Sequence, residues 1–298
     1  MGKRESLARV GAAYAVAIGV GAAWLVWGPS TGHVWLDGLV ADLLATLVVF
    51  AASRLHRNSS FYDAWWSVLP PLLAAYWWIE RDPDATAARF WLLMAVTLIW
   101  SVRLTGNWLY AFPGLHHEDW RYGPMKQGAR EKAPWLEPLV DLMGIHVIPT
   151  LQVFLGMVPV YVVTREGHDL GWLDVVALVV GLGAVALETA ADVQMHRFGR
   201  TKQPGQVMDQ GLWSWSRHPN YFGEFSFWLA LGLFGLAASP FSWWVLVGAV
   251  AMLAMFLGAS IPMMEKRSLE RRPAYQDVVD RVPLFVPRPP RPAPRAVR

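Results

Sequence analysis

Long apolar stretches constrain the fold of this chain more than any other feature. Eight of them lie at about residues 11–28, 35–54, 62–80, 87–110, 139–164, 171–195, 222–239 and 242–263. Each approaches the roughly 20 residues that a helix needs to cross the roughly 30 Å hydrocarbon core of a membrane. The sequence therefore predicts an all-α membrane protein, a polytopic bundle of about seven or eight transmembrane helices.

Composition supports this prediction. Hydrophobic residues make up 54% of the 298 residues and charged residues only 16%, whereas soluble domains carry about 25% charged residues. The 18 Trp and 8 Tyr suit a membrane interface, where amphipathic rings collect. A net charge of +3 is too small to indicate a nucleic-acid partner. Because the chain has no Cys, disulfides, thiolate nucleophiles and cysteine metal sites are excluded.

Lys and Arg residues predict the orientation, because the cytoplasmic loops of membrane proteins carry an excess of them. With the N-terminus in the cytoplasm, 22 of the 26 Lys and Arg residues fall on the inner side. Only Arg81, Arg89 and Arg165 fall on the outer side, and Arg103 lies within a predicted helix. We therefore expect both termini in the cytoplasm and the protein in a bacterial inner membrane.

The chain is expected to form a single transmembrane catalytic domain over residues 1–287. Residues 288–298 form a basic, Pro-rich tail, a composition typical of disorder and of contact with anionic lipid headgroups. Two inner connections, 111–138 and 196–221, are long and rich in charged and amide side chains, whereas the outer connections are short. The chemistry of the protein is therefore expected at the inner ends of the helices.

A stripe of ionisable residues marks one face of the stretch 171–195 and its inner continuation. Glu188, Asp192 and His196 recur every four residues and so share one helical face. An ionisable group inside a membrane costs about 2.5–3.5 kcal/mol on insertion scales, so the stripe requires a reason. Two interpretations are open. These side chains pair with Arg or Lys of a neighbouring helix, or they accept hydrogen bonds from a ligand that enters from the cytoplasm.

Other polar residues lie in or beside apolar stretches. Asp63 opens the stretch 62–80, where it is either a helix cap or a functional acid. Asp42 lies in the middle of a predicted span. Arg103 and Asn107 lie one turn apart, and an Arg at that depth either pairs with a buried acid or holds an anionic cofactor.

No metal is expected, although His116 and His117 precede two acids. Adjacent side chains diverge, and no second cluster has the spacing of four residues that a helical zinc site uses.

The most specific stretch of the chain spans residues 210–224. Pro219 suits the first turn of a helix, and Asn220 and Glu224 then lie one turn apart on one face. Arg217 and His218 precede this helix start, where backbone amides and cationic side chains favour a phosphate. Basic residues alone would also fit an ordinary cytoplasmic loop, but Asn220 and Glu224 facing the bundle would not.

These residues resemble the steroid 5-alpha-reductase family, in particular its bacterial membrane branch. The resemblance covers about residues 60–287. It is carried by Arg-His-Pro-Asn-Tyr-Phe-Gly-Glu at 217–224, by the helix with Glu188 and Asp192, and by Glu-Asp-x-Arg-Tyr at 118–122. Isoprenylcysteine carboxyl methyltransferases, which use S-adenosylmethionine, share the Arg-His-Pro-x-Tyr-x-Gly part of this core.

The resemblance implies a helical bundle that opens to the cytoplasm and encloses NADPH. Together with the patterns above, it suggests as cofactor-binding residues Arg103, Arg121, Tyr122, Glu188, Asp192, Arg197, Arg200, Lys202, Arg217, His218, Asn220, Tyr221, Glu224 and Tyr275. Asp63 takes the place of a family Glu that holds the keto oxygen of the substrate together with a Tyr from the next helix. Trp108 and Tyr110 are the candidates for that partner.

The leading hypothesis is therefore an enzyme, an NADPH-dependent reductase of an activated C=C bond. Its substrate is expected to be a lipophilic enone, steroid-like or isoprenoid, that arrives from the bilayer lipids. The alternatives are a methyltransferase that uses S-adenosylmethionine and a transporter of lipids or small molecules. Transport predicts polar residues through the full depth of the membrane, whereas here they crowd the inner half.

Overall fold

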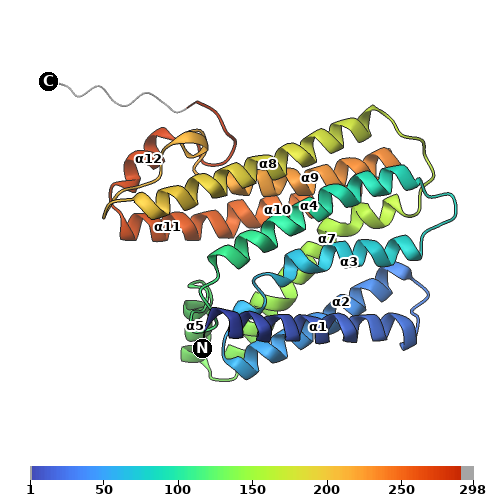
Figure 1. Cartoon of the computed structure of the whole chain (residues 1–298), viewed down its shortest axis with the longest axis horizontal. Helices are drawn as coiled ribbons and strands as arrows, with labels where there is room; N and C mark the ends of the chain where they lie inside the picture. Colours follow the sequence, from blue (N-terminus) through green and yellow to red (C-terminus); the bar gives the residue numbers. More distant parts are fainter. Residues whose placement is uncertain (1, 290–298) are drawn as a thin grey trace.

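A computed structural model describes residues 2–289 of the chain, which form helices and turns without a strand (Figure 1). The helices are α1 (Lys3–Trp27), α2 (Val34–His56), η1 (Ser59–Phe61), α3 (Trp65–Ile79), α4 (Ala87–Ala111), α5 (Tyr122–Lys132), α6 (Leu136–Val140), η2 (Asp141–Val147), α7 (Ile148–Val163), α8 (Trp172–Thr201), η3 (Gly211–Ser214), α9 (Pro219–Ala238), η4 (Trp243–Leu246), α10 (Val247–Met255), η5 (Phe256–Ser260), α11 (Ile261–Arg271) and α12 (Tyr275–Arg281). Most of the predicted tail, residues 290–298, lies outside the described residues.

Within residues 2–289, seven helices are long and apolar enough to cross a membrane. Segments α6, η2 and α7 form one of them, and η4, α10, η5 and α11 form another. The prediction of an all-α polytopic membrane protein is confirmed. The predicted stretch 62–80 differs, because its helix α3 has only 15 residues and is therefore about 22 Å long. The short helix η1 and a turn precede α3, which starts well inside the bundle (Figure 1).

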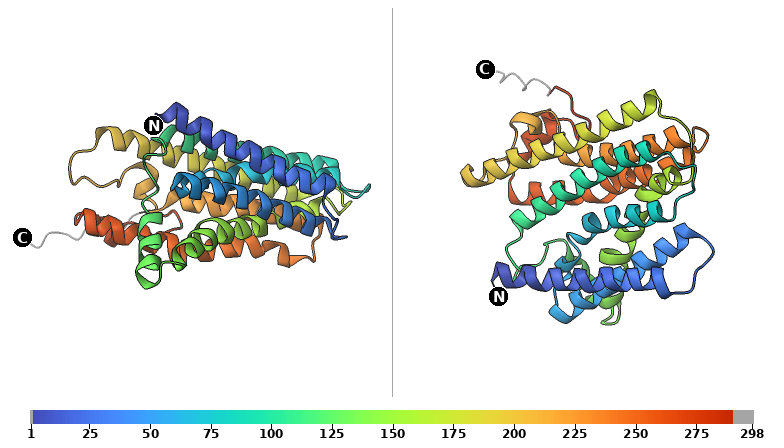
Figure 2. Two further views of the ribbon diagram at one scale, coloured as in Figure 1. Left: turned by 90° about the horizontal axis from the view of Figure 1, so that it is seen from below. Right: turned by 45° about the vertical axis from the view of Figure 1, so that its right-hand side comes forward.

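The spanning helices run roughly parallel, and the start of α1, α5 and α12 gather at one end of the bundle, which we call the N-terminal end (Figure 1). Helix α5 lies across the ends of the spanning helices (Figure 2, left). The connections at the opposite end are short, for example residues 28–33 and 80–86. The long connections with polar residues therefore lie together at the N-terminal end.

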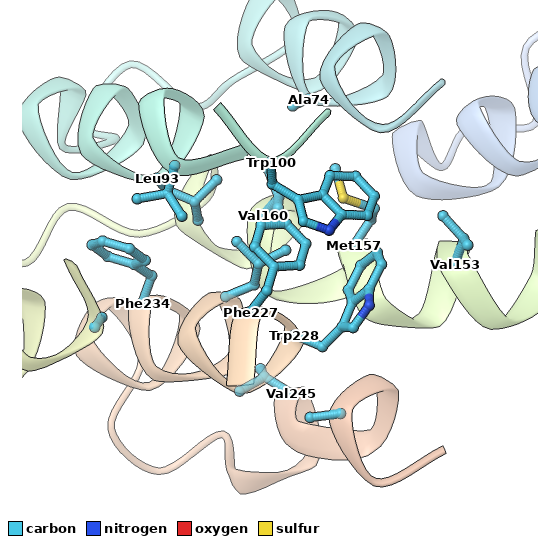
Figure 3. Packing of buried hydrophobic residues seen from close by; sticks show 14 of the residues in the cluster. Ala74, Leu93, Trp100, Val153, Met157, Val160, Phe227, Trp228, Phe234 and Val245 are labelled. Atoms are coloured by element: carbon cyan, nitrogen blue, oxygen red, sulfur yellow. The ribbon is translucent and has the colours of Figure 1, made fainter. Parts of the chain in front are cut away.

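Two hydrophobic cores hold the bundle together. The larger one joins α3, α4 and α7–α10, and its centre is aromatic (Figure 3). There Trp100 of α4 stacks on Phe227 of α9 with ring centroids 4.4 Å apart, and Trp228 meets both rings edge-on. The smaller core joins α1, α2 and η1, and Trp66 packs against both cores.

One buried ion pair links α4 to α8 near the end opposite the N-terminal end. Arg89 is fully buried and donates to both carboxylate oxygens of Asp174, at 2.7 and 3.0 Å. Its remaining donors bind the carbonyl oxygens of His168 and Asp169. Asp174 also accepts the backbone N–H of Gly171 and so closes the first turn of α8. The pair therefore fixes where α8 enters the bundle.

We predict that Arg89→Met lowers the free energy of unfolding by about 3–5 kcal/mol, because it leaves Asp174 buried without its cation. Urea unfolding of the detergent-solubilised protein measures this. The double variant Arg89→Met/Asp174→Leu should recover part of the loss, since both charges are then gone. Arg81→Met, at an exposed position, is the control. Equal effects of Arg81→Met and Arg89→Met would contradict the role given to the pair.

Candidate functional site

A cavity of about 380 Å³ opens at the N-terminal end, where the two cores meet. Its lining comes from most of the helices around it: Tyr62, Asp63, Trp66, Arg103, Leu104, Asn107, Arg121, Tyr122, Met125, Gly144, Ile145, Pro149, Gln152, Val153, Asp192, Asn220, Tyr221, Glu224, Met252, Met255, Phe256, Ser260 and Met263. Eight of the residues proposed from the sequence are among them, namely Asp63, Arg103, Arg121, Tyr122, Asp192, Asn220, Tyr221 and Glu224. Residues far apart in the chain thus meet around one space.

The cavity lies beside the contact between α8 and α9 and not between these two helices. Helices α8 and α9 pack directly on each other at Gly223, where an added Cβ would come within 2.4 Å of the Glu188 Cγ. Gly223 therefore allows the Glu188 side chain to lie between the two helices. The cavity lies beside this contact and is closed by α3, α4, α5, α7 and α10.

A polar ladder between α4 and α8 forms one wall of the cavity. We use this name for Arg103, Asn107 and Tyr110 of α4 together with Glu188, Asp192, His196 and Arg200 of α8. Arg103 pairs with Glu188 and lies 3.6 Å from an Asp192 oxygen. Asn107 donates to Asp192 at 3.0 Å and contacts the Nε2 of His196 at 2.7 Å. Tyr110 contacts the His196 ring and the Arg200 guanidinium.

The contacts within the ladder show which of the two interpretations, pairing with a cation or availability to a ligand, fits Glu188 and which fits Asp192. Glu188 is 1% exposed and has a cation partner in Arg103, so for this residue the structural pairing is realised. Asp192 is only partly buried and lines the cavity. Asp192 is therefore the member of the stripe that a ligand in the cavity could contact.

The start of α9 brings two further acceptors to the cavity. Pro219 occupies the first position of the helix, as predicted. Glu224 accepts the indole N–H groups of Trp100 and Trp228 at 3.1 and 2.9 Å. The Asn220 Oδ1 is buried and has no hydrogen-bond donor among residues 2–289. A buried amide oxygen without a donor is costly, so this atom marks a place where a ligand N–H or O–H would fit.

Asp63 faces the cavity from the turn between η1 and α3. It makes no capping hydrogen bond to α3, whose N-cap residue is Ala64. Instead its Oδ1 accepts the phenolic O–H of Tyr122 at 2.6 Å. Burial raises the pKa of the Asp63 carboxyl to about 6, and the hydrogen bond from Tyr122 offsets part of this rise. Asp63 is therefore half neutral at about pH 6 and about one tenth neutral at pH 7.

The tyrosine beside Asp63 comes from a different element than the one proposed from the sequence. Trp108 stacks on Phe112 in the smaller core. Tyr110 is 54% exposed and belongs to the outer end of the polar ladder. The residue that contacts Asp63 is thus Tyr122 of α5 and neither candidate of α4. The connection before α5 folds against η1, where the Asp119 N–H donates to the Ser60 Oγ.

Arg217 and His218, which the sequence suggested beside a phosphate, have protein partners in the structure. Arg217 donates to both carboxylate oxygens of Glu265 and to the carbonyl oxygens of Val279 and Val282. His218 lies 3.2 Å from the same carboxylate. This arrangement holds the start of α9 against α11 and α12.

The remaining proposed residues lie outside the cavity. Helix α8 continues to Thr201, beyond the predicted end at 195, and carries Arg197 and Arg200 on an exposed final turn, with Lys202 directly after it. Tyr275 begins α12, and burial beside Glu265 raises its pKa to about 12. Arg121, in contrast, comes from an inner connection and does line the cavity, where its guanidinium donates to Asp119 at 2.8 Å.

Another part of the cavity lining is apolar and was not predicted; we call it the apolar wall. It is formed by Ile145, Val153, Met252, Met255, Phe256 and Met263. Two π-helical segments, η2 and η5, border it with Gly144 and Ser260, and such segments are frequent at functional sites. Methionine side chains adapt to ligands of irregular shape. Gln152, a polar residue within the apolar stretch 139–164, also lines the cavity and is a signal that was not used in the prediction.

Comparison with known proteins gives a family but no chemistry. Residues 49–282, which include the whole cavity lining, match the model of a family described as "Protein of unknown function (DUF1295)". The chain is also 28% identical over 276 residues to "Uncharacterized protein C594.04c" of Schizosaccharomyces pombe. The aligned region covers 84% of this chain and 79% of the relative. No solved structure matches. Because the family match covers most of its length, the chain belongs to the DUF1295 family.

Proposed function

We propose that this protein is an NADPH-dependent membrane reductase that saturates a C=C bond conjugated to a carbonyl group in a lipophilic substrate. The observation that carries the proposal is the position of the Asp63–Tyr122 pair. This pair faces the same cavity as Asp192 and Asn220, which offer hydrogen-bond acceptors, and as a wall of apolar side chains. One space thus combines an acid, polar contacts for a cofactor and a surface for an apolar molecule.

Asp63 is the group that would polarise the substrate. In its neutral form it can donate a hydrogen bond to the carbonyl oxygen of an enone. Negative charge grows on this oxygen as the double bond is reduced, and a donor fixed at that position stabilises it. Tyr122 holds the other carboxyl oxygen and so orients the acid. A carboxylic acid kept neutral by burial is an established way to donate to a developing oxyanion.

The polar side of the cavity fits the nicotinamide and ribose portion of NADPH, which supplies a hydride to the β-carbon when bound. Asp192 and the donor-free Asn220 Oδ1 would accept hydrogen bonds from its hydroxyl or amide groups. Arg121 adds a positive charge, and Tyr122 and Tyr221 add aromatic surface. These side chains would orient the cofactor, while the packed aromatic core around Trp100 excludes water from deeper in the bundle.

The same core argues against a transporter. Trp100, Phe227 and Trp228 are at most 1% exposed and fill the space between α4 and α9. A translocation path would need polar groups and space beyond them. The distribution of Lys and Arg supports a cytoplasmic location for the N-terminal end, so the charged cofactor would enter from the cytoplasm and the substrate from the bilayer.

We predict that NADPH raises the thermal unfolding temperature of the purified protein, whereas S-adenosylmethionine does not, because only a bound ligand stabilises the folded state. Asn220→Ala should weaken NADPH binding about tenfold, the effect of losing one buried hydrogen bond. Gln276→Ala removes an exposed amide on α12 and should leave the affinity unchanged. Saturable stabilisation by S-adenosylmethionine alone would refute the reductase proposal in favour of the methyltransferase.

A second prediction concerns the pH dependence of kcat/KM, which follows from the protonation of Asp63. Since the neutral acid is the active form and its pKa is about 6, kcat/KM for an enone should fall about tenfold per pH unit above that value. Tyr122→Phe removes a hydrogen bond that lowers this pKa, so the falling limb should move to higher pH. Initial rates of NADPH oxidation with a 3-oxo-4-ene steroid, measured between pH 5 and pH 9, test both statements.

Asp63→Asn separates chemistry from binding in the same assay. It should abolish the pH limb and lower the turnover while NADPH still binds, because an amide is a much weaker acid than a carboxyl group and stabilises a developing oxyanion less. Asp277→Asn, an exposed carboxyl on α12, serves as the control. If Asp63→Asn keeps both the turnover and the pH limb, another group polarises the substrate.

A further inference from the structure

A second acid of this bundle has no place in the proposed chemistry. Asp42 lies within α2 and is 3% exposed, near the middle of a spanning helix. Within residues 2–289 it forms no ion pair, and its one hydrogen bond comes from Thr46 at 3.4 Å. Ionisable residues at such a depth are costly and by default functional. Asp42 is therefore a residue whose retention needs an explanation.

A chain of hydroxyl groups joins Asp42 to the cavity. The Thr46 Oγ1 lies 3.1 Å from the Thr150 Oγ1, and this atom lies 2.8 Å from the hydroxyl of Tyr62. The indole N–H of Trp65 donates to the Thr46 Oγ1 at 3.1 Å. Tyr62 lines the cavity next to Asp63. The side chains of Asp42, Thr46, Thr150 and Tyr62 are all buried, so this series of hydrogen bonds is shielded from bulk water.

The direction of the hydrogen bonds follows from the state of Asp42, because each hydroxyl has one hydrogen to donate. If Asp42 is ionised, Thr46 donates to it, Thr150 donates to Thr46, and Tyr62 must donate to Thr150. If Asp42 is neutral, it donates to Thr46, and every bond of the chain reverses. Tyr62 then accepts from Thr150 and keeps its own hydrogen for an acceptor in the cavity.

The surroundings of Asp42 select between these two directions. A carboxylate without a cation inside a membrane bears a large desolvation cost, whereas a neutral acid needs only hydrogen-bond partners. Thr46 can accept from both Trp65 and Asp42 with its two lone pairs. The neutral acid therefore satisfies every hydroxyl up to Tyr62 at the lower cost.

We propose that Tyr62 is a second hydrogen-bond donor to the lipophilic ligand of the cavity, held in the donor orientation by Asp42 through the hydroxyls of Thr46 and Thr150. This inference rests on the proposed function, because it adds a specificity residue to the same site. It narrows the substrate class to molecules that present an oxygen acceptor near Tyr62. Asp42 and the two threonines act through Tyr62 and are positioning residues.

Infrared difference spectroscopy tests the state of Asp42 without any ligand. The wild-type protein should show a C=O stretching band of a protonated carboxyl group, shifted in D₂O, that is lost in Asp42→Asn. The exposed control Asp277→Asn should keep this band. If the spectra of the wild type and Asp42→Asn show no difference in this band, Asp42 is not neutral and the inference is overturned.

Binding of a ¹³C-carbonyl-labelled 3-oxo-4-ene steroid, measured without NADPH, tests the donor. Tyr62→Phe should weaken binding about tenfold and shift the C=O stretch of the bound probe to higher frequency. Asp42→Asn should bind like the wild type, because its amide also donates to Thr46. Asp42→Leu and Thr46→Val should behave like Tyr62→Phe, whereas Thr46→Ser should retain binding.

The outcomes separate this inference from the proposed function. Asp42→Asn as damaging as Asp42→Leu, an unchanged affinity in Tyr62→Phe, or no binding of the ketone by the wild type each overturns the inference. A ketone that binds as described in a protein that does not bind NADPH would refute the reductase and leave the role of Tyr62 intact. Enone reduction by a protein whose infrared spectrum lacks the Asp42 band would support the reductase and overturn the role of Tyr62.

Discussion

The polar ladder between α4 and α8 is the interaction on which the rest of this structure depends. Arg103 and Asn107 of α4 meet Glu188, Asp192 and His196 of α8 at matching intervals of one turn. Charged groups at this depth are tolerated only when they are paired. Arg103, Asn107 and Asp192 are paired with one another and also line the cavity. Because these charged groups are paired with one another, they can form a rigid polar wall of the cavity.

The rest of the site is arranged around this wall. Glu224 ties α9 to α4 through Trp100, and Gly223 lets α9 approach Glu188. The Asp63–Tyr122 pair closes the same cavity from η1 and α5. Rigid support of this kind is what a site needs to hold a cofactor and a substrate in fixed relative positions. The ion pairs Arg217–Glu265 and Arg89–Asp174 hold neighbouring helices together at the two ends of the bundle.

Features that depend on residue spacing along one helix could be predicted from the sequence. Contacts between segments that are distant in the sequence could not. The spans, the start of α9 at Pro219 and the shared face of Glu188 and Asp192 all follow from spacing along one helix. The partner of Asp63 could not be predicted, because Tyr122 lies on a short helix whose place depends on the whole fold. The pairing of Arg217 with Glu265 could not be predicted either, because a basic residue before a helix looks the same whether it binds phosphate or a carboxylate of another helix. The apolar wall gave no signal, since its residues look like any lipid-facing or core residue.

The central claim is that NADPH occupies the cavity beside the ladder. Because the chain has no Cys, Met125→Cys places a single thiol at the cavity lining, on α5. The rate at which a water-soluble maleimide labels this thiol is the most direct test, with Gln276→Cys on α12 as the control. The account predicts that NADPH slows labelling of Met125→Cys and not of Gln276→Cys. An unchanged rate at saturating NADPH, or protection by S-adenosylmethionine alone, would contradict it.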